Sequence, residues 1–130
     1  MGDRCNLFFA DANRGDTLTG VYVYRHWGGE RTPRELAEVL DSKTARARWG
    51  DEGYLMRILI TELLRDDLGG DTGSGIGSTL VAVGDGYPLL CVDLVAQKIG
   101  FVPERSSDAA VAGWRNVKTF EEFIETPVWL

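Results

Sequence analysis

The most informative run of this sequence is Gly20-Val21-Tyr22-Val23-Tyr24-Arg25-His26-Trp27-Gly28-Gly29. Its β-branched and aromatic residues are typical of a strand, and the glycine pair ends that strand in a turn. A second apolar run over residues 5–10 precedes it, separated by the turn-rich segment 11–16. The sequence therefore predicts a β-hairpin from residues 5–10 and 17–27.

Helix signals follow the hairpin. Thr32, Pro33 and Glu35 match a capping box with proline at the first helical position, so a helix is expected to begin there and to continue or fray towards Trp49. A second, largely apolar helix is expected over residues 51–68. A second capping box, Thr119 to Glu122, predicts a short helix through residue 124.

The remaining apolar runs predict strands over residues 79–83 and 89–102. The resulting order is β-β-α-α-β-β-α. It indicates a single α+β domain over residues 1–130, with an antiparallel four-stranded sheet and helices on one face. Side chains alternate along a strand, so Tyr22, Tyr24 and His26 face away from Val21 and Val23. The tyrosine face has no evident cover, and we expect it to form a homo-oligomer interface or a ligand floor.

Composition narrows the class of protein. The chain has 130 residues, ordinary hydrophobic content and a net charge of −6, which argues against binding a long nucleic acid. No apolar run is long enough to cross a bilayer, and the N-terminus lacks the layout of a signal peptide. We expect a cytoplasmic protein with no membrane association and no cofactor. Cys5 and Cys91 are expected to be reduced, buried thiols.

The strand end also provides candidate ligand-binding residues. Aromatic rings stack on a base, cations meet an anion, and glycines allow close backbone approach. A structural alternative has Trp27 filling the core and His26 satisfied by hydrogen bonds. Arg57, on the apolar helix, needs either an internal carboxylate or a ligand anion. The glycine-rich loop over residues 69–78 either cradles a phosphate with its backbone amides or is a mobile connector or lid. The predicted ligand-binding set is Tyr22, Tyr24, Arg25, His26, Trp27, Gly28, Gly29, Arg57, Thr72 and Ser74.

A catalytic alternative uses different chemistry. His26 is the only histidine and titrates near neutrality, so it could act as a general acid or base. Asp66, Asp67 and Asp71 could hold a divalent cation through oxygen, although they could equally be surface charges that end the helix. No metal site and no catalytic residue are assigned outside this alternative, and enzymatic activity is left open.

Several motifs resemble those of a group of small uncharacterised bacterial and phage proteins. They are Tyr24-Arg25-His26-Trp27-Gly28-Gly29, Trp49-Gly50-Asp51-Glu52, Asp66-Asp67, Thr72-Gly73-Ser74-Gly75-Ile76-Gly77 and Cys91-Val92-Asp93. The resemblance covers roughly residues 5–100 and the short C-terminal helix. It implies a bacterial or phage setting, and by analogy a counter-defence role, but no activity.

Three functions are consistent with these observations. The first is an oligomeric protein that binds a small anionic, nucleotide-like ligand. The second is a protein-interaction module with no small ligand, which would use the tyrosine face. The third is a His26-dependent, metal-assisted phosphodiesterase or hydrolase.

Overall fold

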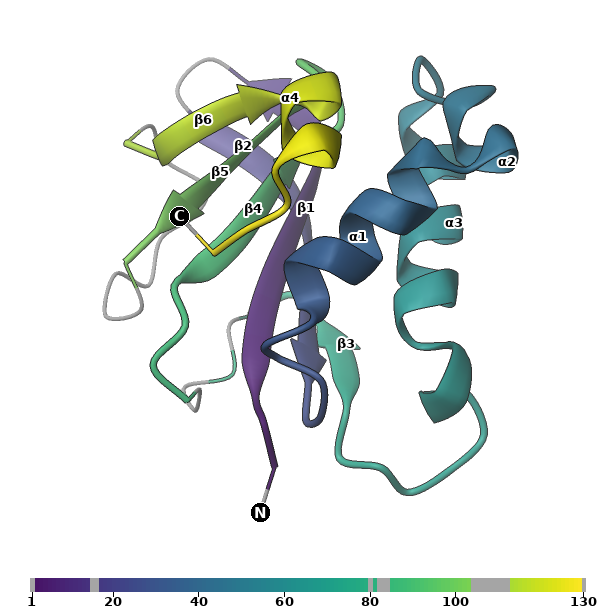
Figure 1. Cartoon of the computed structure of the whole chain (residues 1–130), viewed down its shortest axis with the longest axis vertical. Coiled ribbons are helices and arrows are strands. Elements are labelled where there is room, and N and C mark those ends of the chain that lie inside the picture. Colours follow the sequence, from purple (N-terminus) through teal and green to yellow (C-terminus); the bar gives the residue numbers. More distant parts are fainter. Residues whose placement is uncertain (1, 15–16, 80, 82–84, 104–112, 130) are drawn as a thin grey trace.

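A computed structural model describes residues 2–14, 17–79, 81, 85–103 and 113–129. Its elements are arranged around one mixed sheet, with the helices gathered on one side (Figure 1). In chain order they are β1 (Cys5–Arg14), β2 (Thr17–Arg25), α1 (Thr32–Asp41), α2 (Lys43–Arg46), α3 (Glu52–Leu63), the 3-10 helix η1 (Arg65–Asp67), β3 (Gly75–Gly77), β4 (Leu89–Asp93), β5 (Lys98–Val102), β6 (Arg115–Thr119) and α4 (Phe120–Glu125).

The sheet has the strand order β3-β2-β1-β4-β5-β6, so β1 lies inside it. β1 pairs antiparallel with β2, where Leu7 faces Val23, and parallel with β4, where Leu7 faces Leu90. The α+β class and the first hairpin are confirmed. The expected four-stranded antiparallel sheet is wrong, because the sheet has six strands and its central pairing is parallel.

The helices cover the face to which Leu7, Phe9 and Val23 point. These side chains are fully buried against α1, α3 and α4. Leu36 and Leu40 of α1, Leu55 and Leu59 of α3, and Phe120 and Phe123 of α4 complete this core. Trp49 packs edge-to-face on Phe120 and donates a hydrogen bond to Leu40 O, so this tryptophan closes the core between the helices.

The opposite sheet face is buried as well. Phe8, Leu89 and Cys91 are each no more than 3% exposed, and Tyr22 packs on Phe8 with ring centroids 4.8 Å apart. Asn6 donates a hydrogen bond to Val81 O, which places part of the chain after β3 over this face. The expectation that the tyrosine face lacks cover is therefore wrong. The argument from it for self-association therefore loses its basis.

The structure contains two strands that the sequence did not predict, and it divides one predicted strand into two. β3 lies inside the glycine-rich loop, and β6 precedes the short C-terminal helix. The single strand expected over residues 89–102 is a hairpin of β4 and β5, joined through Gln97 in the left-handed region at φ 57°. Most of the strand expected over residues 79–83 lies outside the described residues, and the described residues 79 and 81 are not in a strand.

Helix boundaries differ from expectation where side chains find tertiary partners. Thr32 does not cap α1: the N-cap is Arg31, which has no side-chain cap, and Thr32 is the first helical residue. Ser42 ends α1 and caps α2 through Ala45 N. α3 ends at Leu63, earlier than residue 68, and continues as a 3-10 turn. The Thr119–Glu122 capping box is confirmed in both directions.

The structure also bears on the predictions for the two cysteines and for membrane-spanning helices. Both cysteines are free, buried thiols, as predicted. In the described part of the chain, no helix is long and apolar enough to cross a membrane.

Gly20 is required where β2 approaches the bulge of β1. A Cβ at this position would lie 1.8 Å from Phe9 O, a backbone atom that cannot move without separating the strands. We expect Gly20→Ala to lower the free energy of unfolding by about 3 kcal/mol. Gly53→Ala is the matched control, because a Cβ there meets nothing within 4 Å on α3. It should leave stability unchanged or raise it by up to about 1 kcal/mol. Equal urea midpoints for the two variants would contradict this account.

Candidate functional site

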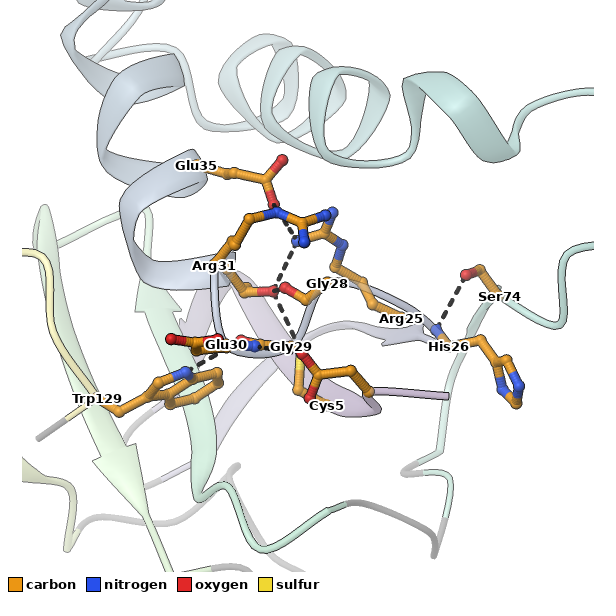
Figure 2. A network of polar contacts seen from close by, with 12 residues as sticks. Cys5, Arg25, His26, Gly28, Gly29, Glu30, Arg31, Glu35, Ser74 and Trp129 are labelled. Carbon is orange, nitrogen blue, oxygen red and sulfur yellow. Dashed lines mark hydrogen bonds and ion pairs between the residues drawn. The ribbon is translucent and has the colours of Figure 1, made fainter. Parts of the chain in front are cut away.

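The end of β2 and the start of α1 are joined by a short loop that the surrounding chain holds firmly. Gly29 N–H donates to Asp3 O at 2.8 Å, and Asp3 N–H donates to His26 O at 3.0 Å. Trp129 Nε1 donates to Gly29 O from the C-terminal segment at 3.0 Å. Residues far apart in sequence thus fix the loop, and Figure 2 shows the polar network around it.

Arg25 is the most deeply placed cation of this network. It is only 6% exposed, and its Nη1 donates to Thr32 Oγ1 at 2.6 Å and to Glu35 Oε1 at 3.1 Å. Its Nε is buried and has no hydrogen-bond partner among the described residues. A buried guanidinium donor without a partner carries a desolvation cost, and this atom is closed to solvent in the described structure.

Thr32 connects the cation to the core. Its hydroxyl donates to Gly28 O at 2.8 Å and accepts from Arg25. Cys5 Sγ lies 3.3 Å from Thr32 Oγ1. Since the hydroxyl is used in this network, it does not cap α1, which explains the failure of the capping-box prediction.

Gly28 lies beneath two guanidinium groups. It has φ +79°, and a Cβ there would lie 3.0 Å from Arg31 Nη2 and 3.3 Å from Arg25 Nη2. Figure 2 shows both guanidinium groups on the same side of the loop, beside Glu35. The Glu35 carboxylate is 3.1 Å from Arg25 and 3.9 Å from Arg31. Two cations therefore share one carboxylate at the N-terminal end of α1, where the helix dipole also favours an anion.

Gly29 has a different role from Gly28. A Cβ on Gly29 would lie 2.8 Å from both Asp3 O and the Tyr87 ring. Tyr87 Oη in turn donates to Asp3 Oδ1 at 2.8 Å. The second glycine of the pair is thus required for packing, whereas the first leaves space under the guanidinium groups.

His26 is half-buried, and its ring points away from those guanidinium groups (Figure 2). Its Nδ1 shares a hydrogen bond with Tyr24 Oη at 2.9 Å, and its ring meets Trp27 edge-to-face at 5.3 Å. Its backbone N–H donates to Ser74 Oγ at 3.1 Å, so the glycine-rich loop lies against the strand end. Trp27 is 51% exposed and does not fill the core.

Asp85 interacts electrostatically with His26 but is already committed to Arg4. Arg4 Nη2 lies 2.9 Å from Asp85 Oδ1, and Arg4 N–H donates to Asp85 Oδ2. These hydrogen bonds lower the pKa of Asp85 to about 2, with a smaller contribution from His26. The carboxylate is therefore ionised at neutral pH and is not a proton donor for catalysis at His26.

The structure brings together only part of the predicted set. Tyr24, His26, Trp27 and Ser74 meet on one side of the loop, and Arg25 and Gly28 on the other. Tyr22 packs on Phe8 in the second core. Two further predicted residues lie elsewhere. The Arg57 guanidinium lies over the Tyr54 ring on α3, and Thr72 is half-buried beside Gly70 in the glycine-rich loop.

The acidic residues of the catalytic alternative gain no support. Asp66 and Asp67 lie in the exposed 3-10 turn, and Asp71 is exposed in the following loop. Throughout the described ranges, no three histidine, cysteine or acidic side chains are grouped so that they could hold a metal ion.

Three residues of the network were missed as site residues. Arg31, Thr32 and Glu35 supply a cation, its hydroxyl partner and its counter-charge. The sequence showed Thr32 and Glu35 as a capping box, which concealed their contacts with Arg25. Arg31 lies two residues after the glycine pair and directly precedes a helix, and that position is the signal that could have identified it.

No protein-family model, curated protein or solved structure matches this chain. The resemblance to small bacterial and phage proteins consequently stays a prediction. The functional argument therefore depends on the geometry of the site alone.

The Cys5 thiol should make stability depend on alkaline pH. Burial raises its pKa from about 9 to about 11, against a smaller lowering by the Thr32 hydrogen bond. The folded state thus favours the neutral thiol, and this contribution is complete below about pH 9 and is lost as pH rises towards 11. Cys5→Ser cannot ionise there, so its unfolding free energy should fall less over that range in chemical denaturation. An unchanged pH profile would contradict this assignment.

Gly73 should control how the loop meets His26. It has φ +87°, and a Cβ there would lie 3.0 Å from His26 Cγ. We expect Gly73→Ala to displace the imidazole and shift its NMR resonances. Gly75→Ala is the control, because a Cβ at that position meets nothing within 4 Å. Identical His26 resonances in both variants would show that the loop does not pack on the ring.

Proposed function

We propose that this protein binds a small ligand carrying an oxyanion, of the nucleotide class, at the loop between β2 and α1. The observation that carries the proposal is the approach of Arg25 and Arg31 over Gly28, where two guanidinium groups share one carboxylate. Guanidinium groups favour phosphate and carboxylate because their donors match two oxygens at once.

Preorganisation supports binding at this place. Arg25 is buried and fixed by Thr32 and Glu35, so ligand binding would not have to order this side chain. Arg31 is largely exposed and can adjust to the ligand.

Trp27 is the candidate stacking partner for a planar group, such as a base, in the second part of the ligand. It is half exposed and packs edge-to-face on His26, on the opposite side of the loop from the guanidinium groups. It is also adjacent to Gly28 in the chain, so the ligand would extend around the Gly28 turn to reach it. Base stacking on an aromatic side chain contributes about 1–3 kcal/mol. Ser74 keeps the glycine-rich loop beside this surface. The resemblance to phage proteins favours a nucleotide signal, which a counter-defence protein would bind without converting it.

The test is an NMR titration of the isotopically labelled chain with inorganic phosphate and with adenosine monophosphate. Both should shift the amides of residues 25–31. Arg31→Gln should weaken both ligands about tenfold or more, as expected for loss of a charged hydrogen bond. Arg34→Gln is the matched control, because Arg34 is an exposed arginine on the same helix and makes no described contact. Trp27→Ala should weaken the nucleotide but not phosphate.

Two results would overturn the proposal. Absence of shifts at residues 25–31 with either ligand would leave the exposed Trp27 surface to a protein partner. Equal weakening by Arg31→Gln and Arg34→Gln would indicate unspecific attraction. Native mass spectrometry of the purified protein would complement the titration, since a retained nucleotide-sized mass identifies the ligand class directly.

A further inference from the structure

A cavity lies at the C-terminal end of α1, away from the oxyanion site, between α1, α2 and α3. Its volume is about 400 Å³, within the range of small-molecule sites. Three kinds of side chain line it: charged groups, hydroxyls and aliphatic groups. They are Glu38, Val39, Ser42, Thr44, Arg57, Ile58, Thr61 and Glu62.

Two opposite charges face this cavity without meeting. Glu38 extends from α1 and Arg57 from α3, and within the described residues neither takes part in an ion pair. The Arg57 guanidinium lies 5.0 Å from the centre of the Tyr54 ring, which orients it without neutralising it. Glu62, the other carboxylate of the wall, is already paired with Arg65. The cavity therefore presents one uncommitted anion and one uncommitted cation.

The remaining lining residues supply aliphatic surface and hydroxyl groups. Val39 and Ile58 supply aliphatic surface, and the Ser42 hydroxyl is occupied by Val39 O and Ala45 N. Thr44 and Thr61 make no hydrogen bond through their side chains in the described structure, so both hydroxyls are free for a ligand. A simple anion would satisfy Arg57 but not Glu38, and a simple cation would do the reverse.

We propose that this cavity binds an aliphatic α-amino acid. The ligand carboxylate pairs with Arg57, its ammonium group pairs with Glu38, and its side chain contacts Val39 and Ile58. Such a zwitterion engages both unpaired charges at once, and its aliphatic part contacts the apolar wall. This inference is independent of the oxyanion site at Gly28, which lies at the N-terminal end of α1.

The experiment is an NMR titration of the full chain with L-leucine, compared with two analogues of the same branched shape. One is 4-methylpentanoate, which lacks the ammonium group, and the other is 3-methylbutylamine, which lacks the carboxylate. L-leucine should shift amides near residues 38–44 and 57–62. Each analogue should bind about threefold to fivefold more weakly than L-leucine, because each loses one of the two exposed ion pairs.

Variants locate the site. Arg57→Gln and Glu38→Gln should each reduce leucine affinity about threefold to fivefold. Both are exposed positions where a neutral side chain is tolerated. Arg48→Gln is the matched control, because Arg48 stacks on the same Tyr54 ring at 4.3 Å but does not line the cavity. Arg31→Gln should leave leucine binding unchanged.

The proposal is overturned by any of three results. The first is no shift in these amides up to about 10 mM leucine. The second is equal binding of leucine and either analogue, which would show that one of the two charges is unused. The third is unchanged affinity in both Arg57→Gln and Glu38→Gln.

Discussion

The parallel pairing of β1 with β4 is the constraint on which the architecture depends. From Cys5 to Ala10 every residue of β1 is buried, because β1 has a neighbour on each edge and a core on each face. A parallel neighbour cannot be reached by a tight turn and requires a long crossover. Here the chain between β2 and β4 supplies that crossover, and it contains α1, α2 and α3 as well as the edge strand β3 (Figure 1).

This crossover also creates the oxyanion site. Because β2 leaves the sheet directly into α1, its last residue, Arg25, lies against the first turn of that helix. The Thr32 hydroxyl and the Glu35 carboxylate then hold the guanidinium, and Gly28 leaves open the space where the two arginines meet. The site is thus a consequence of how one strand joins one helix, and its rigidity comes from Asp3 and Trp129 on the termini.

The local signals of the sequence were reliable where one short segment decides its own structure. The β1–β2 hairpin, the Thr119–Glu122 capping box and the buried thiols are of this kind. The sequence-based predictions failed where a residue distant in the chain offered a hydrogen-bond or pairing partner that the local pattern did not include. Thr32 bonds to Arg25 and Gly28 instead of capping α1, and Gly75–Gly77 becomes a strand because β2 offers an open edge.

The sequence by itself determined that this is an α+β chain, and it drew attention to the strand end at Arg25, His26 and Gly28, because alternation, glycine turns and residue chemistry are local properties. Only the tertiary structure decided the six-stranded mixed order, the cover on the tyrosine face and the separation of Arg57 from that strand end. It also decided that the guanidinium of Arg25 turns towards Arg31 while the His26 ring points away. These features depend on contacts between residues distant in the chain, and their energies are set by burial and pairing that no local pattern encodes.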